Sequence, residues 1–112
     1  MSLVLSISAA VLLFVTAGYH LTGLQEASAG LVGERRGLVR AAWILVGAYW
    51  FITGAIWIAA AFRFLPQATA IWTASIPMLG AIALTAMVGP RFPGVSLLGL
   101  AGTLGLISGL IQ

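Results

Sequence analysis

The sequence contains no cysteine, and it also lacks lysine, aspartate and asparagine. Without cysteine the chain has no disulfide framework, no thiolate nucleophile and no cysteine-based metal site. Its net charge of +3 rests on arginines that stand near the ends of apolar runs, so no continuous basic surface is available for a nucleic acid. These absences exclude disulfide-stabilised and thiol-dependent proteins, and they argue against nucleic-acid binding.

Charge of either sign is scarce. Charged residues make up 6% of the 112 residues, whereas hydrophobic residues make up 62%. A soluble domain of this size leaves a large part of its surface in water and needs polar side chains to cover it. The composition therefore predicts a protein whose solvent is lipid.

Four apolar stretches, at about 3–24, 38–62, 68–88 and 95–111, are long enough to span a membrane. About 20 apolar residues cross a hydrocarbon core of about 30 Å. The connections between them are short and contain Gly or Pro, and short connections make successive helices antiparallel neighbours. We predict an all-α integral membrane protein with four transmembrane helices in an up-down bundle, forming a single domain over residues 1–112.

The segment Ala27-Ser28-Ala29 resembles the cleavage site of a signal peptide. However, no basic residue precedes the apolar run, and a polar stretch separates that run from this segment. We therefore interpret the first stretch as a retained membrane span.

Arginines are distributed unequally between the connections. The first connection and its border carry Arg35, Arg36 and Arg40, the third carries Arg91, and the second carries Arg63. By the positive-inside rule, the first and third connections face the cytoplasm and both termini lie outside. Arginine without lysine, with abundant Ala, Gly and Leu, is typical of a GC-rich bacterial genome, so we predict a multi-pass protein of the bacterial inner membrane.

Three tryptophans and three small residues recur at a spacing of seven: Trp43, Trp50 and Trp57, and Gly47, Gly54 and Ala61. This spacing returns to nearly the same face of a helix, so we call the three tryptophans the tryptophan ladder. The ladder predicts either close packing against another helix or an aromatic wall that binds a lipid tail or a hydrophobic cofactor. We favour packing, because helices in lipid associate through close contact beside small residues.

The members of the ladder differ in their expected depth. Trp43 and Trp57 are far enough apart to approach opposite membrane interfaces, where indole rings are normally found. Trp50 lies near the midplane, where its N–H needs a hydroxyl or carbonyl partner. In the fourth span, Ala101, Gly105 and Gly109 repeat at a spacing of four, which predicts close packing within the chain, with self-association as the alternative.

His20 is the single histidine and stands near the end of the first span. One of its ring nitrogens is a candidate ligand for a haem or chlorophyll-type metal. No second ligand lies in the span, and we therefore favour a polar anchor whose ring hydrogen-bonds a neighbour. His20 and the tryptophan ladder are the candidate cofactor-binding residues; the cofactor itself is unknown, and no metal site or catalytic residue is predicted.

Transport and catalysis find little support in the residues. The length and four-span plan are similar to those of the small multidrug transporters, but these depend on a glutamate in the first span, and here Glu26 and Glu34 both lie in the first connection. Pro77 interrupts the third span and frees the Thr73 carbonyl, which in a transporter would line a substrate path. The chain has no HExxH, GxSxG or P-loop motif, so we predict that it is not an enzyme.

These observations predict a small non-catalytic accessory or scaffold subunit. Its predicted partners are membrane lipids and either the other subunits of a larger membrane complex or further copies of itself. The alternative is a small oligomeric, channel-like facilitator or transporter, with Thr73 and the break at Pro77 along its path.

Overall fold

The computed structural model describes residues 2–111, and all of the regular structure in this range is helical. The long helices are α1 (Ser2–Thr22), α3 (Gly33–Ala61), α4 (Ala68–Met87) and α5 (Pro93–Leu110), and a single-turn helix α2 (Leu24–Ala27) follows α1. Each of the four long helices is long and apolar enough to cross a membrane. The all-α class and the four candidate spans of the prediction are therefore confirmed, and they indicate a multi-pass membrane protein.

Helix α3 begins earlier than the predicted second span, at Gly33 rather than Leu38. The chain enters it from an extended Val32, and Gly33 has a φ of 61°, in the left-handed region that glycine adopts without strain. Glu34 then places a carboxylate in the first turn, where the helix dipole favours negative charge. At about 1.5 Å per residue, α3 is about 44 Å long, so it exceeds a hydrocarbon core of about 30 Å.

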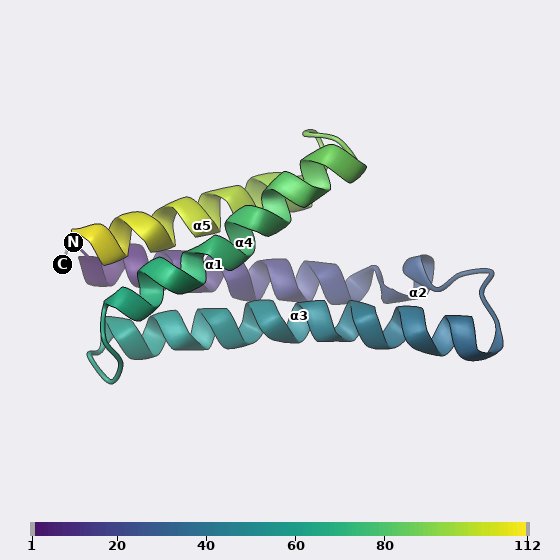
Figure 1. Ribbon diagram of the computed structural model, residues 1–112, viewed down its shortest axis with the longest axis horizontal. Coiled ribbons are helices and arrows are strands. Elements are labelled where there is room, and N and C mark those ends of the chain that lie inside the picture. The colour runs from purple at the N-terminus through teal and green to yellow at the C-terminus, as the bar shows by residue number, and fades with distance from the viewer. Residues whose placement is uncertain (1, 112) are drawn as a thin grey trace.

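Helix α1 lies between α3 and α5, and α4 lies along α5 (Figure 1). Contact between α3 and α4 is more limited. Figure 1 shows both ends of the described chain at the same end of the molecule as the α3–α4 connection, whereas α2 and the α4–α5 connection lie at the opposite end. As a consequence Arg63 is at one end, and the other four arginines are at the end that carries α2.

Small residues fill the places where the helix backbones come closest. Ala9, Ala74 and Ala101 are fully buried, and larger side chains, including Leu13 and Leu98, pack beside them. Near the end that holds the termini, the hydroxyls of Ser6 and Ser108 are 2.5 Å apart and form a hydrogen bond between α1 and α5. Close approach at small residues, together with a hydrogen bond between helices, is the usual basis of helix association in lipid.

Candidate functional site

His20 and Trp43 connect α1 to α3 through two reciprocal hydrogen bonds. The His20 Nε2 atom lies 2.7 Å from the Trp43 carbonyl oxygen, and the Trp43 indole N–H donates to the His20 carbonyl oxygen at 2.6 Å. The two rings stack, with centroids 4.2 Å apart and planes 9° from parallel. Because a carbonyl only accepts hydrogen bonds, Nε2 carries the proton, and Nδ1 keeps the lone pair in the neutral ring.

This arrangement has the geometry that the anchor interpretation describes. The ring of His20 is held by the backbone of the neighbouring helix and by the face of an indole. Its Nδ1 atom keeps the lone pair that a metal ligand requires. Cofactor binding by His20 stays a prediction.

Trp50 lies one ladder step further into the bundle, where its side chain is 8% exposed. Its ring meets the edge of His20, with centroids 4.9 Å apart and planes at 71°. It also approaches α4, where a Cβ added at Gly80 would lie 4.0 Å from the indole. Within residues 2–111 the Trp50 indole forms no hydrogen bond, so the partner expected for it near the midplane is not found there.

Trp57 receives that hydroxyl partner instead. Its indole N–H donates to Thr73 Oγ1 at 2.7 Å, and Thr73 donates in turn to the Thr69 carbonyl oxygen at 2.6 Å. The side chain is 1% exposed, and on its other side the ring lies against Gly105, where an added Cβ would come within 2.6 Å of it. Trp57 is therefore an interior residue that joins α3, α4 and α5, and it does not face lipid.

The small residues next to the ladder and in α5 receive side chains from neighbouring helices of the same chain. Gly47 meets Leu21, Gly54 meets Phe14, Gly105 meets Trp57 and Gly109 meets Ile71. The patterns that predicted close packing are thus occupied within one chain. These contacts support the packing interpretation of the ladder over an aromatic wall for a ligand.

Pro77 is buried inside α4, and the helix continues on both sides of it. The Thr73 hydroxyl, which the transport hypothesis placed on a substrate path, takes part in the hydrogen bonds with Trp57 and Thr69. Both residues therefore make contacts inside the bundle.

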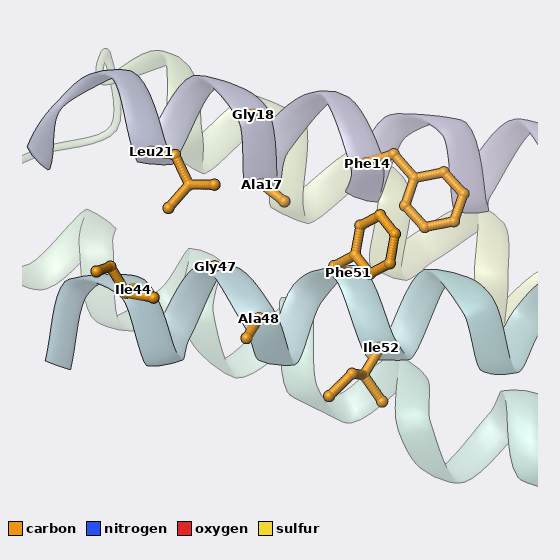
Figure 2. A pocket seen from close by; sticks show the side chains of 9 residues that line it. All are labelled: Phe14, Ala17, Gly18, Leu21, Ile44, Gly47, Ala48, Phe51 and Ile52. Carbon is orange, nitrogen blue, oxygen red and sulfur yellow. The ribbon is translucent and has the colours of Figure 1, made fainter. Parts of the chain in front are cut away.

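An apolar groove of about 460 Å³ lies between α1 and α3, beside the ladder (Figure 2). It is lined by Phe14, Ala17, Gly18 and Leu21 from α1, and by Ile44, Gly47, Ala48, Phe51 and Ile52 from α3. The rings of Phe14 and Phe51, with centroids 5.0 Å apart, face each other at one end (Figure 2). Sequence reasoning missed this groove, although the adjacent small residues of each helix were a signal for it.

Within residues 2–111, His, Cys, Asp and Glu form no group of three that could hold a metal ion. Of the candidate cofactor-binding residues, His20 has a ring nitrogen that could bind a metal, whereas Trp50 and Trp57 are buried against neighbouring helices. Comparisons with protein families, with curated proteins and with solved structures found no match for this chain.

Proposed function

We propose that the chain spans the membrane as an up-down four-helix bundle and acts as a small non-catalytic accessory or scaffold subunit of a larger membrane complex or homo-oligomer. The observation that carries this proposal is the closed interior around Trp50 and Trp57. The Trp57 indole fills the space beside Gly105 between α3, α4 and α5, where a substrate path through the bundle would have to pass. A bundle of this kind acts through its outer surface, which contacts lipids and other membrane subunits.

The outer surface supports the same proposal. Large apolar side chains are exposed on every long helix, among them Val11 on α1, Phe51 on α3, Leu79 on α4 and Leu100 on α5. Lipid tails or the helices of other subunits can cover such surfaces without burying a polar group that lacks a hydrogen-bond partner. Membrane lipids and other membrane subunits, or further copies of the chain, are therefore the partners that we propose.

The arrangement of arginines supports an orientation. The end that carries α2 holds four arginines and the opposite end holds Arg63. The positive-inside rule then gives a cytoplasmic α2 end and outer termini. With the arginine-rich, lysine-free composition, this supports a multi-pass protein of the bacterial inner membrane.

The facilitator hypothesis has less support. It requires Thr73 and the Pro77 break to line a path, and both residues make contacts inside the chain. A path would then have to run between copies, along surfaces that are apolar. The subunit hypothesis requires no such path.

Gentle extraction from native membranes tests the proposal. We expect the native mass of the purified protein to exceed that of one 11.6 kDa chain and its bound lipid. A visible absorption spectrum of the same sample identifies a haem or pigment, if one is held. Isolation as single chains under every mild condition, without any partner, would contradict the subunit role.

A further inference from the structure

The α1–α3 groove has the depth of one membrane leaflet. From Ile44 to Ile52 it extends about 12 Å along α3, at about 1.5 Å per residue. Half of a hydrocarbon core is about 15 Å. The facing rings of Phe14 and Phe51 stand at the inner end of the groove, and Leu21 and Ile44 stand at the end near α2 (Figure 2).

A cation stands one turn beyond the α2 end of this groove. Arg40 precedes Ile44 by four residues, and the spacing from Arg40 through Ile44, Ala48 and Phe51 follows one face of the helix. About 20 residues counted back from Ala61 cover the hydrocarbon core, which leaves Arg40 at the level of the lipid headgroups.

The Arg40 guanidinium has N–H donors that its hydrogen bond to Ser28 leaves unused. Its side chain is half-buried, and it donates one hydrogen bond, to Ser28 Oγ at 3.4 Å, which is its single hydrogen bond within residues 2–111. A guanidinium carries five N–H donors in a planar fork that suits phosphate oxygens. Arg36, one turn earlier on α3, is exposed and adds a second positive charge.

We propose that the α1–α3 groove binds an acyl chain of an anionic phospholipid, whose phosphate is held by Arg40 and Arg36; this rests on the proposal that the four helices span the membrane. The groove is apolar and of leaflet depth, and the cations lie at its headgroup end. Its volume, about 460 Å³, lies in the range of about 300–1,000 Å³ that small-ligand sites occupy.

A helix of a second copy fits this groove less well. A spanning helix is about 30 Å long within the hydrocarbon, whereas the groove ends at the facing phenylalanines near the midplane. Two copies related by a two-fold axis along the membrane normal would also bring their Arg36 and Arg40 side chains together. An anionic lipid neutralises these charges instead.

The test is a lipid titration followed by native mass spectrometry of the full chain in mild detergent. The probes are dioleoyl phosphatidylglycerol, which is anionic, and dioleoyl phosphatidylcholine, which is zwitterionic. We expect the wild-type protein to bind the anionic lipid at least about fivefold more tightly than the zwitterionic lipid. One arginine at the membrane surface contributes about 1 kcal/mol, and this free energy corresponds to about fivefold in affinity. Arg40→Gln should remove about fivefold of the affinity for phosphatidylglycerol and a smaller factor of that for phosphatidylcholine, because the choline cation of the second lipid already offsets the charge of its phosphate.

A second pair of variants tests the groove itself. Ala48→Leu places a larger side chain in it and should lower the binding of both lipids, whereas Ala83→Leu adds the same side chain to the exposed face of α4 and should change neither. Gly18→Leu is a second groove-filling variant, since a Cβ added at Gly18 meets no atom within 4 Å. Arg63→Gln is the matched charge control at the opposite end of the molecule.

Three outcomes would overturn the proposal. These are equal affinity of the wild-type protein for the two lipids, equal losses in Arg40→Gln and Arg63→Gln, or a change in subunit number with Ala48→Leu while lipid binding is unaffected. The last outcome would assign the groove to a second copy. Subunit number and bound lipid are read from the same spectra, so failure of the lipid site is distinguished from failure of the subunit role.

Discussion

The contact between Gly105 and Trp57 gives a quantitative test of the closed interior. In Gly105→Ala the new methyl group would come within 2.6 Å of the Trp57 ring, and the ring is held on its other side by the hydrogen bond to Thr73. Overpacking costs about 1–3 kcal/mol. A lost hydrogen bond between membrane helices adds about 0.6 kcal/mol. The higher helix propensity of alanine returns about 1 kcal/mol. We therefore expect Gly105→Ala to lower the free energy of unfolding by about 0.5–2.5 kcal/mol.

Gly18→Ala is the matched control, because it makes the same substitution within a helix at a position where the added Cβ meets no atom within 4 Å. It should leave stability unchanged or raise it by up to about 1 kcal/mol. Reversible unfolding of the purified protein in mixed micelles, titrated with a denaturing detergent, measures both variants. In a Trp57→Phe background the ring is shorter, so Gly105→Ala should lose most of its effect, and a double-mutant cycle gives the coupling. Equal effects of Gly105→Ala and Gly18→Ala, or no coupling to Trp57, would refute the closed-interior argument.

Three further predictions concern the ladder, His20 and the topology. Trp50→Ala should destabilise the protein by about 3–5 kcal/mol and Trp43→Ala by less, because Trp50 is the more buried; equal unfolding midpoints would contradict this. His20→Ala should cost about 1–3 kcal/mol in the same titration, since it removes one hydrogen bond and one ring stack, and it should also remove any bound chromophore; unchanged stability would show that the link to Trp43 contributes nothing. Reporters that act only in the periplasm should be active at both termini and silent after Gly30, and the reverse pattern would invert the proposed orientation.

The helices were predictable because the signals for them are local. Apolar runs of spanning length, broken by Gly and Pro, mark four stretches of this chain, and the structure has a helix at each. The early start of α3 was not predicted, because polar residues dominate 33–37 and the cause is the backbone geometry at Gly33 with the dipole interaction of Glu34. Hydropathy reports where a helix enters lipid and does not report where its hydrogen bonds begin.

The contacts of the candidate site depend on the register between helices, which the sequence of one helix does not determine. The spacing of the ladder predicted that the three tryptophans share one face of a helix. It also predicted that a buried indole N–H requires a hydroxyl or carbonyl partner. It did not predict that Thr73 of α4 lies beside Trp57 rather than Trp50. The groove escaped prediction for the same reason, since it forms where the small residues of α1, around Gly18, lie opposite those of α3, around Gly47.

We propose that this chain works as a packed subunit of an assembly. Native mass spectrometry of vesicles prepared from the native membrane, without detergent extraction, distinguishes an assembly from a single chain. We predict ions of an assembly heavier than one 11.6 kDa chain with its lipids, from which the chain dissociates on activation. Vesicles that release the chain only as a monomer, at all activation energies, would contradict the claim.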